Sequence, residues 1–221
     1  MSVLALPRGA HILDLCCGAG RHSRALGKAG YKVLGIDLSR DLLLAAKSKS
    51  RHRSPQYLRG DMRALPLRGA CMDGVLNLFT SFGYFPRDSQ NLKVLLEVAR
   101  ILKPKACFVL DYFNSSVVIA NLVARSEKNM GGMRLQERRH FDRRSNRLIK
   151  ITKIIGRNNS QTRRESVRAY NPRELAALFK KAGLKVVARY GDLKGTPFES
   201  RSSPRCVLIG SSMLTSARLT A

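Results

Sequence analysis

Residues 11–23, HILDLCCGAGRHS, constrain the fold of this chain more than any other segment. Apolar residues 12–15 are typical of a buried strand, and an acid, Asp14, interrupts them. Gly18 and Gly20 follow, and a helix-like stretch begins directly after them. A buried carboxylate is costly without a partner, and glycine lets a ligand approach the backbone closely. The segment therefore predicts a ligand site at the carboxyl edge of an open α/β sheet.

Two classes of cofactor use such a turn. A dinucleotide fingerprint needs G-x-G-x-x-G, but Ser23 stands at the third glycine position. A cofactor with an ammonium group would use Asp14 as a charge-assisted acceptor. The segment resembles motif I of class I S-adenosylmethionine-dependent methyltransferases; a strand–turn–helix with an incidental acid is the alternative. The resemblance implies that the methionine part of the cofactor contacts Asp14, Cys16, Gly18, Ala19, Gly20 and Arg21.

A second segment, YKVLGIDLS at residues 31–39, predicts a strand over residues 33–36 that ends at Asp37. An acid about 20 residues after the glycine turn meets a ribose in βαβ units of this kind. The resemblance therefore implies that Asp37 holds the cofactor ribose and that Leu38 packs on the adenine ring. Ser39 is the better N-cap for the helix expected over residues 40–48.

Two further segments continue the match. QYLRGDMRALPL at residues 56–67 implies that Asp61 accepts from the adenine amino group and that the N–H of Met62 meets a ring nitrogen. By itself, Gly-Asp is a turn signal. DGVLNLFTSFGYF at residues 73–85 implies that Asn77 and Leu78 pass beside the methionine part.

The next residues predict a helix and a strand. The helix is expected over residues 89–102, with Ser89 as its N-cap and Pro104 just beyond its end. The strand is expected over residues 106–112, with Asp111 near its end. Residues 10–112 thus follow the family in order.

The second half of the chain predicts an insertion and a return to the sheet. A helix-like stretch covers residues 115–123, and Gly131-Gly132 ends it. Three β-like segments follow at hairpin spacing, over residues 133–141, 147–156 and 162–170. The resemblance implies that such an insertion forms part of the substrate pocket; a stabilising lobe or dimer surface is the alternative. A helix capped by Asn171 then leads to two strands, over residues 184–190 and 205–211.

The predicted fold is α/β: a Rossmann-like, doubly wound, seven-stranded sheet whose last strand is antiparallel, with a small antiparallel β insertion. The predicted parts are a cofactor-binding core at 1–113, an inserted helix and β subdomain at 114–170, a C-terminal helix with the final two strands at 171–212, and a flexible tail at 213–221.

Catalysis of methyl transfer needs alignment of the two partners, and a base only where the acceptor holds its proton tightly. No residue is marked out as that base. The candidates for contact with the substrate are His22, Tyr84, Tyr112 and His140. Residues 77–80 lack the Asn/Asp-Pro-Pro-aromatic pattern of amino-group methylation on nucleic-acid bases.

The amino-acid composition limits which binding partners, metals and cellular locations we expect. The net charge is +26, which favours anionic partners, although no RNA-binding module is visible; an arginine bias of composition is the alternative. The five cysteines show no metal-ligand spacing, so we expect no metal and a reducing, cytoplasmic location. No apolar run approaches the roughly 20 residues of a membrane span, and no secretory signal is visible.

We therefore expect an S-adenosylmethionine-dependent methyltransferase acting on a small molecule. A methyltransferase that docks RNA or another macromolecule on its basic insertion stays open, as does a non-catalytic protein that binds S-adenosylmethionine or nucleic acid. Family members usually have several tens of residues before motif I, and the first strand here begins about ten residues from Met1. We expect either that the insertion supplies the cover of the site or that the chain is a shortened version. A dimer is compatible with the sequence.

Overall fold

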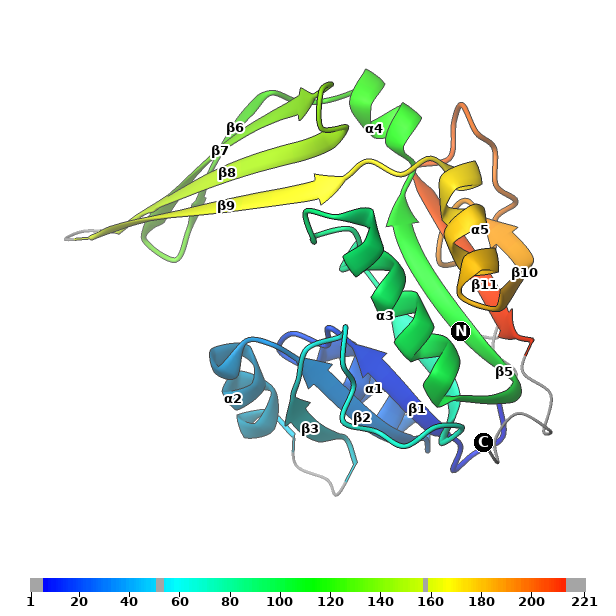
Figure 1. The fold of residues 1–221 in the computed structure, drawn as a ribbon. Coiled ribbons are helices and arrows are strands. Elements are labelled where there is room, and N and C mark those ends of the chain that lie inside the picture. The colour runs from blue at the N-terminus through cyan, green and yellow to red at the C-terminus, as the bar shows by residue number, and fades with distance from the viewer. Residues whose placement is uncertain (1–5, 51–53, 157–158, 214–221) are drawn as a thin grey trace.

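A seven-stranded sheet forms the centre of the computed structural model, which describes residues 6–50, 54–156 and 159–213 (Figure 1). Its strands are β1 (His11–Leu15), β2 (Lys32–Asp37), β3 (Gln56–Arg59), β4 (Met72–Asn77), β5 (Leu102–Phe113), β10 (Leu184–Tyr190) and β11 (Arg205–Ser212). They lie in the order β10-β11-β5-β4-β1-β2-β3. Neighbours pair in parallel except at β11, which is antiparallel to both β5 and β10. The expected doubly wound sheet with an antiparallel last strand is confirmed.

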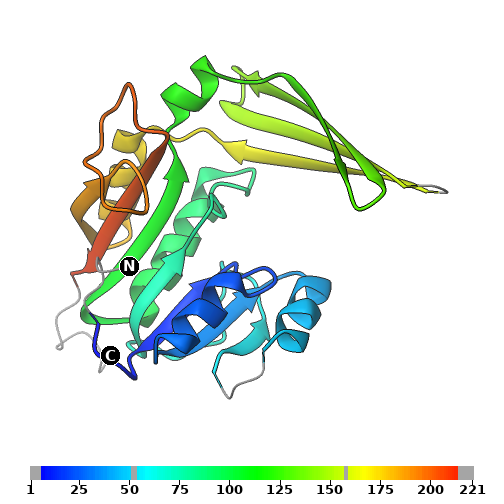
Figure 2. The same ribbon diagram turned by 180° about the vertical axis from the view of Figure 1, so that it is seen from behind.

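Helices cover both faces of this sheet. They are α1 (Arg21–Lys28), α2 (Arg40–Ser48), α3 (Asp88–Ile101), α4 (Ser115–Ala120) and α5 (Pro172–Lys181). α3 and α5 lie on one face (Figure 1), and α1 lies on the other (Figure 2). The larger apolar core contains Leu95, Phe108 and Phe179, on the α3 and α5 side. Because side chains alternate along a strand, β5 also sends Val109 into a smaller core with Leu26 of α1.

Several element boundaries differ from those expected; α4, for example, ends at Ala120 rather than at residue 123, and β9 covers Ser160–Arg168 rather than residues 162–170. Two further examples come from the central sheet and its helices. The helix α3 begins at Asp88 with Arg87 at its N-cap, so the assignment of Ser89 as the cap was wrong. The side chain of Gln90 accepts from the N–H of Arg87 at 3.3 Å. This contact stabilises a helix that begins at Asp88, one residue before the expected start. The strand β5 starts at Leu102 rather than at residue 106. A register shift in the β4–β5 pairing accommodates the extra residues, and this irregularity could not be read from the polar Lys103 and Lys105.

The insertion folds into a separate antiparallel sheet, which we call the arm. Its strands are β6 (Arg125–Met130), β7 (Met133–Asp142), β8 (Arg147–Ile155) and β9 (Ser160–Arg168), in that order. The arm projects from the body of the molecule in Figures 1 and 2. Three of these strands were expected, and β6 was missed. Gly131 and Gly132, with φ of 56° and 78°, form the two-residue turn that joins β6 to β7, a hairpin signal visible in the sequence.

The predicted division of the chain into core, insertion and C-terminal parts stays a prediction. Residues 214–221 of the predicted flexible tail lie outside the described residues. In the part of the chain that the structure describes, no helix has the length and apolar character needed to cross a membrane.

Arg147 fastens the arm to the body. Its side chain is only 9% exposed, and its guanidinium donates to the carbonyl oxygens of Gly83, Tyr84 and Phe85 at 3.0–3.2 Å. It also donates to the hydroxyl and the carbonyl of Ser166 at 2.7 Å. Burial lowers the pKa of this guanidinium. The Arg147 side chain therefore donates hydrogen bonds to several backbone carbonyl groups at the junction of the arm with the loop after β4.

Replacing Arg147 by Met should lower the free energy of unfolding by about 2 kcal/mol, because buried carbonyl groups lose their donor. Urea denaturation followed by circular dichroism measures this change. Arg144→Met is the control, since Arg144 is exposed in the turn after β7 and should change stability by less than about 0.5 kcal/mol. Equal stability of the two variants would contradict the anchoring role.

Candidate functional site

A strained turn connects β1 to α1 at the carboxyl edge of the sheet. Cys16 has a left-handed backbone with φ of 62°, which is rare outside glycine. Gly20 also has a positive φ of 72°, and a Cβ atom there would lie 2.2 Å from the hydroxyl oxygen of Tyr57. Backbone strain of this kind persists where the surroundings hold it in place, and it concentrates at functional sites. Glycine is therefore required at position 20 for both conformation and space.

Asp14 lies buried beneath this turn, with 2% of its surface exposed. Its Oδ2 accepts a hydrogen bond from the hydroxyl of Ser23 at 2.5 Å. Burial raises the pKa of Asp14, and the Ser23 bond opposes that rise. Ser23 is thus the partner of Asp14 at the position where a dinucleotide fingerprint has glycine. The Ser23 backbone also contributes a hydrogen bond to this carboxylate, which keeps further lone pairs that a cationic ligand group can use.

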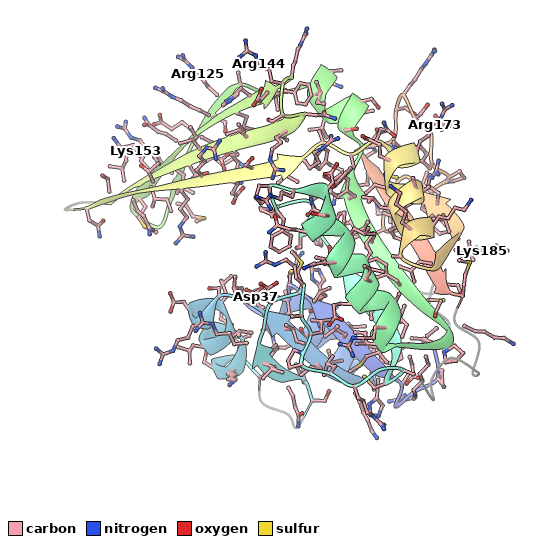
Figure 3. The ribbon with its side chains drawn as sticks, in the orientation of Figure 1. Asp37, Arg125, Arg144, Lys153, Arg173 and Lys185 are labelled. Carbon is pink, nitrogen blue, oxygen red and sulfur yellow. The ribbon has the colours of Figure 1, made fainter. Side chains whose placement is uncertain are left out.

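Asp37 joins the ends of β1 and β2. Its Oδ2 accepts from the N–H of Gly18 at 2.9 Å, and its Oδ1 accepts from the N–H of Ser39 at 2.8 Å. Each carboxylate oxygen keeps a further lone pair for a ligand hydroxyl. Leu38, the next residue, is 63% exposed. Figure 3 shows Asp37 on the side of the molecule that faces the arm. Ser39 caps α2 by accepting from the N–H of Leu42, as expected.

Asp61 and Met62 follow β3. Arg63 binds the Asp61 carboxylate with two nitrogens, the shorter contact being 2.6 Å, and this hydrogen bonding lowers the pKa of Asp61. The Sδ atom of Met62 lies 3.5 Å from the Sγ of Cys16, so the β3 end packs against the strained turn. An adenine amino group would share Asp61 with Arg63, a pairing that the sequence did not predict.

Asn77 ends β4 beside the same turn. It is 1% exposed, and its amide donates to the carbonyl of Leu15 at 3.2 Å. Its Oδ1 is buried without a partner among the described residues. An unsatisfied buried acceptor is rare in folded proteins and marks a place where a ligand or water can bind. Burial raises the pKa of the neighbouring Cys16 thiol to about 12, so this thiol stays protonated at neutral pH.

The turn after β4 is held by a buried ion pair that the sequence did not reveal. The Asp111 carboxylate is fully buried and binds the guanidinium of Arg205 at 2.7 Å. Its other oxygen accepts from the N–H of Phe79 at 2.8 Å, and Arg205 also donates to the hydroxyl of Thr80. Phe79 and Thr80 have φ of 55° and 58°, so this network holds two successive left-handed residues.

That turn presents an exposed aromatic ring. Phe79 is 54% exposed and stacks on His22, with ring centroids 5.1 Å apart. The guanidinium of Arg21 lies 4.8 Å from the Phe79 ring. Burial lowers the pKa of His22, while the charges of Asp14 and Asp111 act in the opposite direction. Burial thus favours the neutral form of His22, and its Nε2 accepts from the Arg21 guanidinium at 3.1 Å.

An apolar cavity of about 140 Å³ adjoins His22 on the α1 side of the sheet. The residues that line it come from α1, β4, β5, β10, β11 and the loops that follow β4 and β10: His22, Ala25, Leu26, Leu76, Leu78, Val109, Tyr190, Asp192, Leu193, Val207 and Ile209. A neutral imidazole at the margin of an apolar cavity can accept a proton from a ligand held there.

The other candidate residues lie in different surroundings. Tyr84 is 42% exposed in the loop after β4, and burial raises its pKa. Tyr112 is fully buried, its hydroxyl donates to the carbonyl of Arg168, and burial raises its pKa, so we assign it a structural role. His140 is exposed on β7 of the arm, opposite Ile149. Of the candidate bases, His22 is the one that the structure brings to the cavity.

The described residues hold no group of three or more His, Cys, Asp or Glu side chains that could bind a metal ion.

Arg205→Met should lower the free energy of unfolding by about 3 kcal/mol, because it leaves the buried Asp111 carboxylate without a cation. Adding Asp111→Asn to this variant should recover part of the lost free energy of unfolding, because burial of a neutral amide costs less free energy than burial of an unpaired carboxylate. Chemical denaturation measures both. Arg201→Met is the exposed control. A double variant less stable than Arg205→Met would contradict this account.

Comparison with known proteins gives a consistent result. Residues 12–105 match the profile of a methyltransferase domain family. The 2-phytyl-1,4-naphtoquinone methyltransferase of Synechocystis is 35% identical over 122 residues, which cover 51% of this chain and 49% of that protein. The chain thus spans about half the length of this relative. The cypemycin N-terminal methyltransferase of a Streptomyces species is 28% identical over 204 residues, covering 91% of this chain and 83% of that protein.

Among solved structures, an S-adenosylmethionine-dependent methyltransferase from Clostridium acetobutylicum superposes with a TM-score of 0.80. It is 17% identical, and the superposition covers 91% of this chain and 83% of that one. At this identity the likeness establishes the fold alone, over the part of the chain that is covered.

Proposed function

We propose that this chain is a class I S-adenosylmethionine-dependent methyltransferase, and that it transfers a methyl group to a small apolar acceptor bound beside Phe79 and His22. The match of residues 12–105 to a methyltransferase domain family supports this. The observation that carries the proposal is the linkage of Asp37 to the Gly18 amide. It brings the acids at the ends of β1 and β2 to one ligand-binding edge.

The residues present fit S-adenosylmethionine. The carboxylate of Asp14 has the charge and the lone pairs to accept from the ammonium group, and the buried Oδ1 of Asn77 needs a donor. Asp37 keeps lone pairs for the two ribose hydroxyls, and exposed Leu38 offers an apolar surface to the adenine. When bound, the cofactor supplies an electrophilic methyl group on a sulfonium ion. Asp61, Met62, Cys16, Gly18, Ala19, Gly20, Arg21 and Leu78 complete the proposed cofactor contacts.

The acceptor side is apolar. Phe79 presents an aromatic face at the carboxyl edge of β4, and the cavity beside His22 is lined almost wholly by hydrocarbon side chains. Such a surface favours a planar or apolar molecule with few polar groups. The name of the Synechocystis relative describes an acceptor of this kind, a naphthoquinone. These features together favour an aromatic or otherwise apolar acceptor for this chain.

The chain's own residues align the acceptor and move one proton. The Asp111–Arg205 pair fixes the turn that carries Phe79, so the acceptor meets a preorganised wall. His22 accepts the proton of the attacking hydroxyl or amine at Nε2, after the Arg21 guanidinium, which lies 3.1 Å from that nitrogen, has moved aside. The loop that carries Tyr84, fastened to the arm by Arg147, helps to exclude water from this edge. The five free cysteines support a cytoplasmic location for this chemistry.

Asp37→Ala should weaken the binding of S-adenosylmethionine at least tenfold, because two hydrogen bonds from ribose hydroxyls to a carboxylate are lost. Isothermal titration calorimetry measures the affinity without any turnover. Asp41→Ala is the control, since Asp41 is exposed in the first turn of α2 and should bind as the wild type does. Tritiated methyl transfer into fractionated cell extract then tests the reaction, and label should follow the small apolar molecules. Tight binding of NAD in place of S-adenosylmethionine would overturn the proposal.

His22→Gln should lower kcat about 100-fold with little change in KM, because the proton acceptor is lost while the cavity keeps its shape. The wild-type rate should rise with pH through the pKa of His22, which burial holds below 6.5, and stay level above it. The His22→Gln variant should lack this rise, which is the acidic limb of the pH–rate profile. Initial rates with reduced 1,4-naphthoquinones as first acceptors measure both profiles. His11→Gln, at the exposed start of β1, is the control and should retain the limb. If the rate of His22→Gln still rises with pH in the same range, the group that titrates there is a residue other than His22.

A further inference from the structure

We propose that the outer face of the arm binds the phosphodiester backbone of a nucleic acid. This face consists of alternate residues on the four strands, and its exposed cations are Arg125, Arg134, Arg138, Lys153 and Arg164. In Figure 3, Arg125 and Lys153 lie on the side of the arm turned away from Asp37. The surface is therefore separate from the cofactor edge, and the proposal does not rest on methyl transfer.

Three of these arginines stand in one row across the arm. Arg125 lies directly opposite Arg138, Arg138 opposite Ile151, and Ile151 opposite Arg164. Neighbouring strands lie about 4.8 Å apart, so the row is roughly 14 Å long. One nucleic-acid strand carries a charge about every 3.4 Å of helix axis, so a row of this length spans about four phosphates. The row is therefore long enough to contact several successive phosphates.

The charges on the two faces of the arm differ in their partners. On the inner face, Glu137 binds Arg139 and Lys150, and Lys150 also binds Glu165 at 2.7 Å. On the outer face, Arg134 contacts Glu127 at 3.5 Å. Within the described residues, Arg125, Arg138, Lys153 and Arg164 have neither an ion pair nor a side-chain hydrogen bond. The register also places Lys128 and Arg163 on the inner face, where they form no ion pair among the described residues. The two inner acids thus pair with Arg139 and Lys150 alone, whereas on the described part of the outer face only Arg134 has an acidic partner.

The directly opposed pair Arg125 and Arg138 is unfavourable in the isolated chain. Like charges across neighbouring strands destabilise a sheet. An anion that binds both guanidinium groups removes this repulsion, and the planar guanidinium is suited to bidentate contact with phosphate. A shallow groove beside the row is lined by Gln136, Arg138, Ile151, Lys153 and Thr162, which adds polar donors next to the cations.

Other occupants fit this surface less well. A second copy in a symmetric dimer would bring one arginine row against the other, and the two would repel. A lipid surface favours exposed apolar side chains among the cations. The exposed apolar residues of the arm are Met130 and Met133, and strand alternation places them on the inner face at the β6–β7 turn. A nucleic acid is the partner that uses the row without burying apolar area.

The test compares two triple variants that each remove three positive charges. Arg125→Gln, Arg138→Gln and Arg164→Gln alter the row. Arg173→Gln, Lys181→Gln and Lys185→Gln alter exposed residues of α5 and β10, and Figure 3 shows Arg173 and Lys185 on the opposite end of the molecule. The probe is a fluorescein-labelled single-stranded RNA of about 20 nucleotides, with a DNA of the same sequence in parallel. Fluorescence anisotropy gives the affinity over a salt series.

The wild type should bind with a steep salt dependence. The row variant should bind at least tenfold more weakly at about 50 mM salt, and the slope of log K against log[salt] should fall by about 2, because three phosphate contacts are lost. The control triple should keep the wild-type slope. Equal losses in both variants, or binding to phosphatidylserine vesicles with none to RNA or DNA, would overturn the proposal. If the row variant does not fold, Arg164→Gln alone should lower the slope by about 0.7.

Discussion

The ion pair between Asp111 and Arg205 holds the edge of the sheet at which the proposed chemistry takes place. Asp111 lies two residues before the end of β5 and Arg205 begins β11, so the pair fastens the antiparallel strand β11 to its neighbour. The same carboxylate accepts from the N–H of Phe79, and the carbonyl of Asp111 accepts from the N–H of Thr80. The strain of two left-handed residues is sustained by this one buried charge, and an aromatic ring is exposed as a result.

The same physical arrangement recurs at the other strands. Asp14, Asp37 and Asp111 each lie near the carboxyl end of a parallel strand, and loop donors hold each of them in place. A carboxylate that is only partly satisfied by neutral donors keeps capacity for a ligand. The Asp111 carboxylate differs because Arg205 neutralises its charge. Its role is therefore to hold the turn after β4 rather than to bind a ligand. Among these three acids, the structural one is thus the one that a cation neutralises; Asp61 after β3 differs, because it pairs with Arg63 on a partly exposed surface where a ligand can share it.

Sequence reasoning found the residues whose partners lie nearby in the chain. Asp14 and Ser23 are 9 residues apart and lie in one segment, and Gly18 and Asp37 are 19 apart, in two segments that follow each other at a characteristic spacing. Arg205 lies 94 residues from Asp111, and Arg147 lies 64 from Gly83. No local pattern links these pairs, because the strand order that joins them is a property of the folded sheet. Strand β6 was missed for another reason: both of its faces are polar, so it has no apolar alternation to detect.

The arm shows how far the net charge can be interpreted. A total of +26 would be uninformative if the cations were evenly spread and paired. The register of the arm instead sorts them, because Glu137 and Glu165 fall on one face and the row of Arg125, Arg138 and Arg164 on the other. A one-residue shift in any pairing would exchange these faces. The position of the unpaired cations therefore depends on register, which composition cannot reveal. The same register places Glu137 and Glu165, with the arm cations that they pair with, on the inner face, apart from the arginine row. Methyl transfer and anion binding can therefore use separate surfaces of one chain.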